Sequence, residues 1–194
     1  MSLLRRLLCP AVLLVAMLAV PAHATRLLLL DTPTLAQRSQ DIVVGRVLST
    51  RSYWDDRHTR IFTEVVVSVD ETLKGSTDAN GTLTLTQLGG RVDGARYDVP
   101  GSPRFVNGEE ALLFVYRGPT GRAQVNGMAQ GKFDIITDAE SGEKLVQRTL
   151  PGLAVKDLHT MALAPGDAPA RRFRLSELRA EIQSALTSAP AEAK

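Results

Sequence analysis

One segment, RSYWDDRHTR at residues 51–60, concentrates side chains that could bind a ligand or a metal ion. The candidate binding residues in this segment are Tyr53, Trp54, Asp55, Asp56 and His58. The aromatic pair combines a large contact area with polar groups, as recognition surfaces do. The two aspartates and the histidine could ligate a metal, although metal sites usually draw their ligands from several segments. Three interpretations stay open: a recognition surface, a metal site, or a connection between strands that carries solvated charges.

A second candidate segment, residues 89–103, is rich in glycine and proline and has no hydrophobic period. The sequence predicts a long surface loop there, and such loops often carry function. Its candidate binding residues are Gly89, Gly90 and Arg91. The run GGRVDG lacks the following helix that a phosphate-binding loop requires, so a flexible turn is the simpler interpretation. We expect this loop and residues 53–58 to form one end of the fold, where a partner binds.

The sequence contains no catalytic motif of a known hydrolase type. A Ser-His-Asp enzyme needs an oriented histidine beside a nucleophile, and no GxSxG elbow accompanies His58 or His159. We therefore expect a non-enzymatic binding or interaction module without a cofactor. The alternative is a periplasmic hydrolase or a metal-dependent enzyme that uses His58 with Asp55 or Asp56.

The first 24 residues predict a signal peptide. Arg5 and Arg6 form a positively charged start, residues 7–20 an apolar stretch, and Ala22-His23-Ala24 a small-residue cleavage motif. The apolar stretch of 14 residues is shorter than the ~20 that a membrane-spanning helix needs. We expect cleavage before Thr25, and a periplasmic or secreted protein with no membrane attachment.

Composition narrows the classes of partner. Removal of 24 residues from 194 leaves 170, enough for one domain with a core. That part of the chain carries 21 basic and 21 acidic residues without a basic cluster, which argues against nucleic acid as the partner. The only cysteine, Cys9, lies in the predicted signal peptide, so the mature domain is expected to be stable without disulfides. Another exported protein is the expected partner.

Hydrophobic periodicity predicts a mainly β protein. In residues 60–70, Ile61, Thr63, Val65 and Val67 share one face, and this period of two is typical of a strand. Further strands are expected at 26–30, 42–48, 82–86, 110–116, 122–126, 132–137 and 144–148. A short helix is expected from Thr32, as N-cap, to about Gln40, and a longer one over 175–186 with Ser176 as N-cap.

These elements predict an antiparallel, OB-like β-barrel with a short N-terminal and a C-terminal helix, because closure removes exposed strand edges. The expected organisation is a signal peptide at 1–24, a barrel domain at 25–163, a linker at 164–172, a helix at 173–187 and a disordered tail at 188–194.

Several short motifs carry resemblances to known families. They are Ile61-Phe-Thr-Glu-Val, Glu71-Thr-Leu-Lys-Gly, Gln87-Leu-Gly-Gly, Gly108-Glu-Glu-Ala-Leu-Leu-Phe and Gln130-Gly-Lys-Phe. Together they resemble an uncharacterised family of exported bacterial β-rich proteins. A second resemblance is carried by a strand over residues 42–47 (IVVGRV), an alternating strand, Leu73-Lys-Gly, a further strand and Gly108-Glu-Glu-x-Leu-Leu-Phe. This order is similar to that of netrin-like domains, which include the tissue inhibitors of metalloproteinases. That resemblance implies an OB-type barrel and a protease-inhibitor function. Those inhibitors use disulfides and an N-terminal cysteine, which the mature chain lacks, so the resemblance does not extend to their mechanism.

Overall fold

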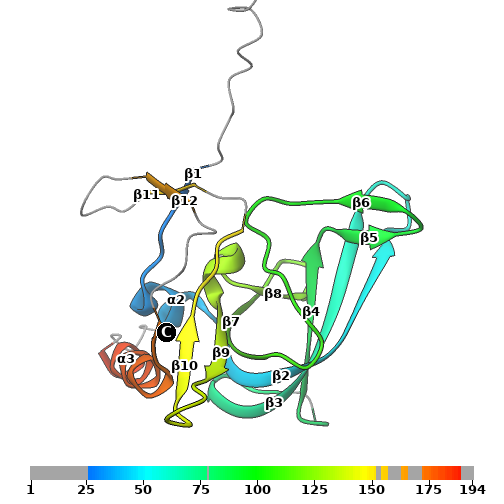
Figure 1. The fold of residues 1–194 in the computed structure, drawn as a ribbon. Helices are drawn as coiled ribbons and strands as arrows, with labels where there is room; N and C mark the ends of the chain where they lie inside the picture. Colours follow the sequence, from blue (N-terminus) through cyan, green and yellow to red (C-terminus); the bar gives the residue numbers. More distant parts are fainter. Residues whose placement is uncertain (1–25, 78, 152–153, 157–162, 166–171, 189–194) are drawn as a thin grey trace, which may run out of the picture.

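The computed structural model describes residues 26–77, 79–151, 154–156, 163–165 and 172–188 (Figure 1). The predicted signal peptide, the predicted tail after residue 188 and most of the predicted linker lie outside the described residues. Among the residues described, none forms a helix that is both long and apolar enough to cross a membrane.

Five strands form a closed barrel, which confirms the prediction of a mainly β barrel. They are β2 (Asp41–Trp54), β3 (Ile61–Lys74), β4 (Thr82–Leu88), β7 (Glu110–Arg117) and β8 (Ala123–Val125). The order around the barrel is β7-β2-β3-β4-β8, and an antiparallel pairing of β8 with β7 closes it. All neighbours are antiparallel except β4 and β8, which run parallel and meet at Leu85 and Ala123.

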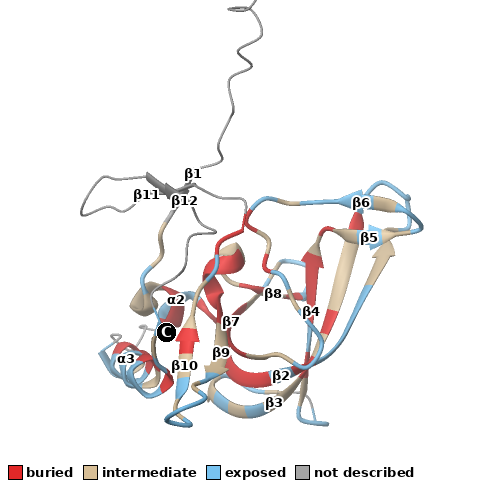
Figure 2. Cartoon of the chain, viewed as in Figure 1, coloured by how far each residue is buried: buried red, intermediate tan, exposed pale blue. Residues whose placement is uncertain are grey.

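The barrel interior is filled by the alternate residues that the sequence predicted to be core. Val65 and Val67 are fully buried there. The remaining buried members of this barrel core are Val43, Val47, Leu83, Leu85, Ala111, Leu113, Val115, Ala123 and Val125. Figure 2 shows buried segments in the strands of the barrel, and β2 is buried in its first half but not in its second half.

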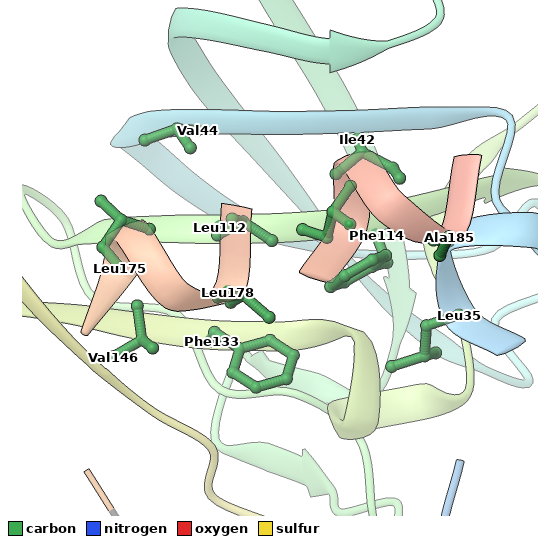
Figure 3. Packing of buried hydrophobic residues seen from close by; sticks show 12 residues of the cluster. Leu35, Ile42, Val44, Leu112, Phe114, Phe133, Val146, Leu175, Leu178 and Ala185 are labelled. Carbon is green, nitrogen blue, oxygen red and sulfur yellow. The ribbon is translucent and has the colours of Figure 1, made fainter. Parts of the chain in front are cut away.

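A second core lies on the outer side of β2 and β7, under two helices (Figure 3). On this side β7 is extended by β9 (Lys132–Thr137), β10 (Lys144–Gln147) and β13 (Phe173–Arg174). The helices are α2 (Thr32–Arg38) and α3 (Leu175–Ser188), which match the predicted N-terminal and C-terminal helices. The helix core contains Leu35, Ala36, Ile42, Val44, Leu112, Phe114, Phe133, Val146, Leu175, Leu178, Ile182 and Ala185.

Neither predicted N-cap is the residue that precedes its helix. Asp31, not Thr32, is the N-cap of α2, because its extended backbone lets its carboxylate accept a hydrogen bond from the backbone N–H of Thr34 at 2.8 Å. The hydrogen bonds from Thr34 hold the pKa of Asp31 below its ordinary value. In α3, Ser176 lies inside the first turn, because the helix begins at Leu175, whose side chain is buried in the helix core.

The remaining elements are short. β1 (Arg26–Leu28), β11 (Ala154–Lys156) and β12 (Leu163–Pro165) form a three-stranded sheet, and a 3-10 helix spans Met128–Gly131. The predicted loop at 89–103 contains a hairpin of β5 (Gly90–Val92) and β6 (Ala95–Tyr97). Sequence periodicity missed this hairpin because each of its strands has only three residues.

Candidate ligand-binding site at the mouth of the barrel

The candidate site begins where the inner face of the barrel changes from apolar to polar. Strands β2 and β3 have 14 residues each, twice the 7 of β4, and β4 pairs with the half of β3 that lies next to the β2–β3 hairpin. Beyond the core residues Val65 and Leu85, alternation places Thr63 and Gln87 on the same inner face. Thr63 pairs with Ser52 on one side and with Gln87 on the other, so the three side chains form a polar row across three strands.

Hydrogen bonds order two members of this polar row. The Thr63 hydroxyl donates to the backbone carbonyl of Gly89 at 2.7 Å. Because a hydroxyl has one proton, Ser52 must be the donor in its 2.8 Å contact with Thr63 Oγ1. The third member differs, since Gln87 is only 9% exposed and its Nε2 has no hydrogen-bond acceptor. A buried donor without a partner costs about 1–3 kcal/mol, which a ligand acceptor would recover.

The polar row lines a cavity of about 630 Å³. This volume is within the range of roughly 300–1,000 Å³ typical of small-ligand pockets. Its other walls are the β5–β6 hairpin and the segment 98–106. Three hydrogen bonds hold that segment at the mouth: Ser102 Oγ to Leu88 O at 3.3 Å, Gly101 N to Pro151 O at 2.9 Å and Ala129 N to Gly101 O at 2.8 Å.

Gly89 and Gly90, two of the predicted site residues, lie where the hairpin turns onto the polar row. Their φ angles are +105° and +143°, a region that favours glycine. A Cβ atom on Gly90 would lie 2.5 Å from both Ser52 Oγ and Thr63 Oγ1. The two glycines therefore let the hairpin backbone approach the polar row, and both residues line the cavity.

The rim of the cavity is basic. Arg91, the third predicted site residue in this segment, lines the cavity together with Arg96 and Arg104. The only acidic lining residue is Asp98, which forms an ion pair with Arg96. Arg91 and Arg104 are exposed, and neither makes an ion pair with any residue that the structure describes.

The structure separates the other predicted site residues from this cavity. Tyr53 and Trp54 end β2 rather than belonging to a loop, and residues 55–60 form the turn of the β2–β3 hairpin. Tyr53 packs on Phe62, with ring centroids 6.2 Å apart, on the face of the hairpin opposite to Ser52. Trp54 stacks on His58 at 6.0 Å at the hairpin tip. None of Tyr53, Trp54, Asp55, Asp56 and His58 lines the cavity.

The carboxylate of Asp55 organises the hairpin turn. It accepts hydrogen bonds from the backbone N–H of Thr59 at 2.7 Å, from the Thr59 hydroxyl at 2.9 Å and from the backbone N–H of Arg60 at 3.1 Å. These bonds, the one from Arg60 first, hold the pKa of Asp55 below its ordinary value. No group of three histidine, cysteine or acidic side chains comes together as a metal site in the part of the chain that the structure covers. His159 lies outside the described residues.

Sequence reasoning missed most of the cavity residues, among them Ser52, Thr63, Gln87 and Arg104. A usable signal exists for two of them. Thr63 and Gln87 each put a polar side chain at the end of an otherwise apolar alternation, Thr63-x-Val65-x-Val67 and Leu83-x-Leu85-x-Gln87. A polar residue at that position indicates where the inner face of a barrel meets solvent.

A scan against protein-family models gives no match, and no curated protein matches the sequence.

Proposed function

We propose that this protein is an exported, non-enzymatic binding module that captures a partner in the cavity at the barrel mouth. The observation that carries the proposal is the Gln87 amide: a buried donor without an acceptor that lines an open cavity of about 630 Å³. Such a donor is unfavourable in the free protein and becomes favourable when a ligand supplies an oxygen. The site also has rigid strands on one side and loop-borne charges on the other, as binding sites commonly do.

The proposal extends to the type of barrel and the class of partner. A five-stranded barrel closed by pairing of its fourth and fifth strands supports an OB-type assignment. A protease as the protein partner is the narrower form of the proposal, and its support is the resemblance of the sequence motifs to netrin-like domains. Export is supported by the predicted signal peptide at residues 1–24.

The proposed cavity is tested by filling it. Thr50 is exposed on β2 and lines the cavity, whereas its neighbour Arg51 is exposed on the opposite face of the hairpin. Immobilised protein would be incubated with periplasmic or culture-medium proteins, and the bound proteins quantified by mass spectrometry. We expect Thr50→Trp to abolish capture and Arg51→Trp to preserve it. Equal capture by both variants, or no specific capture by the unmodified chain, would contradict the proposed function.

Export is tested separately by N-terminal sequencing of the protein recovered outside the cytoplasm. We expect the sequence to begin at Thr25, directly after the Ala22-His23-Ala24 motif. Recovered protein that began at Met1 would contradict the predicted cleavage.

A further inference from the structure

The charges around the cavity are unbalanced. Three arginines line it against one aspartate, and that aspartate is already paired with Arg96. Two guanidinium groups, those of Arg91 and Arg104, are thus at the rim without an ion-pair partner among the described residues. Guanidinium groups bind carboxylates through paired, charge-assisted hydrogen bonds. A ligand that carries a negative charge therefore complements this rim.

Apolar side chains stand beside these arginines. Tyr97 and Val106 line the same cavity and are 42% and 65% exposed, which makes them two of the three exposed large apolar residues in the described part of the chain. Exposed apolar side chains at a concave surface favour a ligand that also has apolar groups. A free inorganic anion would leave this part of the rim uncovered.

The polar row indicates a third property of the ligand. Gln87 lines the cavity, and its Nε2 is a buried neutral donor that needs a carbonyl or similar oxygen as its acceptor. A negative charge, an apolar side chain and a neutral carbonyl occur together in one class of ligand, a peptide segment with acidic and apolar residues. Such a segment also suits a protein partner.

From these three observations we infer that the ligand is an acidic peptide segment of the partner protein. Its carboxylate binds at Arg91 and Arg104, its apolar side chain packs on Tyr97 and Val106, and one of its carbonyl oxygens accepts from Gln87 Nε2. This inference rests on the proposed function and specifies the chemistry of the partner.

The probes are two sets of short, N-acetylated and C-amidated peptides in which acidic and apolar residues alternate. The second set carries glutamine and asparagine in place of glutamate and aspartate. Affinity is measured by fluorescence polarisation and confirmed by calorimetry at low and high salt. We expect the acidic set to bind at least about tenfold more tightly than the amide set, with affinity falling as salt rises.

Three variants locate the contacts. Arg91→Gln and Arg104→Gln should each weaken the acidic peptides about tenfold. Gln87→Leu should weaken them comparably without loss of thermal stability, because the amide it removes has no hydrogen-bond acceptor for Nε2 in the free protein. The matched control is Arg122→Gln, since Arg122 is an exposed arginine that lies over the Phe62 ring at 5.6 Å, away from the cavity. This control should keep full affinity.

Several outcomes would overturn the inference. Equal binding of the acidic and amide sets, or indifference to both arginine variants, would exclude recognition of the acidic group. Displacement of the peptides by glutarate at equal concentration would show that a small dicarboxylate suffices. Binding of neither set, while capture of protein by the unmodified chain is still lost in Thr50→Trp, would overturn the acidic peptide and leave the proposed function intact. Absence of any such capture would instead contradict the function itself.

Discussion

Gly75 lies so close to Asp41 that a Cβ atom on Gly75 would overlap the Asp41 carboxylate oxygen Oδ1. Asp41 is only 4% exposed, and the same oxygen accepts a hydrogen bond from the backbone N–H of Ser76 at 3.2 Å. Its other oxygen lies 3.2 Å from Arg117 Nη2, an ion pair without hydrogen-bond geometry. The end of β3 is thereby fixed to the beginning of β2 through one buried carboxylate.

Gly75→Ala is expected to destabilise the fold by about 2 kcal/mol or more, because it adds steric overlap to a φ of +81°. The matched control is Gly81→Ala. Gly81 has a φ of +68° but open space around it, so only the backbone term of about 1 kcal/mol applies. Urea unfolding of the two variants measures the difference. Equal losses would mean that the approach to Asp41 is not a constraint.

Val67→Asp is expected to destabilise the protein by several kcal/mol, because Val67 is fully buried in the barrel core and its replacement would bury an unpaired charge. Val66, the preceding residue, points to the other face of β3 and is only partly buried. Val66→Asp should therefore cost much less. Thermal melting of both variants tests the assignment of the two faces, and similar melting temperatures would refute it.

Lys132→Met is expected to cost about 2–4 kcal/mol. The Lys132 side chain is 8% exposed and forms ion pairs with Glu109, at 3.0 Å, and with Asp134. Removal of the ammonium group would leave the buried Glu109 oxygen without its counter-charge. The control is Lys144→Met, because Lys144 is 47% exposed and its ion pair with Glu110 is worth about 1 kcal/mol or less. Equal stabilities in urea unfolding would contradict this ranking.

Glu110 gives a pH-dependent prediction. The hydrogen bond from Lys144, together with the charges of Lys144 and Arg46, holds the pKa of Glu110 below its ordinary value. Glu110 therefore binds a proton more readily in the unfolded chain than in the folded protein. The stabilisation of the fold by ionised Glu110 is present above the ordinary pKa and is lost as pH falls through the lowered pKa. Because the partners Arg46 and Lys144 are 50% and 47% exposed, the contribution is below about 1 kcal/mol.

Glu110→Gln removes this contribution. The unmodified protein should be more stable than Glu110→Gln at about pH 7, and the difference in unfolding midpoint should shrink toward about pH 3. A difference that stayed constant across this range would show that the effect of the substitution is not electrostatic.

The sequence predicted the barrel well because strand alternation is a local property. The run Ile61 to Val69 carries its period of two in its own residues, and residues 82–86 do the same in β4. The core residues of each strand follow from its own run. The length of β2 was not predictable in this way. Residues 49–54 have little apolar alternation, and they are strand because they pair along their whole length with β3, as Tyr53 does with Phe62.

The sequence predicted only part of the candidate site, because the rest of the site depends on how strands pair and not on a local pattern. Gly89, Gly90 and Arg91 were identified because glycines in an aperiodic segment mark a loop, and all three line the cavity. The hairpin tip with Trp54 was grouped with them by sequence composition, but the structure places its residues outside the cavity. A recognition role for that tip stays a prediction. The unpartnered amide of Gln87 is a property of three strands together and has no local signal.

Strands β2 and β7 are buried on both faces, with Val43 and Leu113 in the barrel core and Val44 and Leu112 in the helix core. Neither core can therefore be exposed without breaking the strands that the other core requires. The barrel and the two helices should unfold as a single cooperative unit, and the backbone amides of these four residues should exchange with deuterium only through global unfolding. A ligand that binds the barrel mouth would consequently slow exchange in β7 beneath the helices, far from its own contacts.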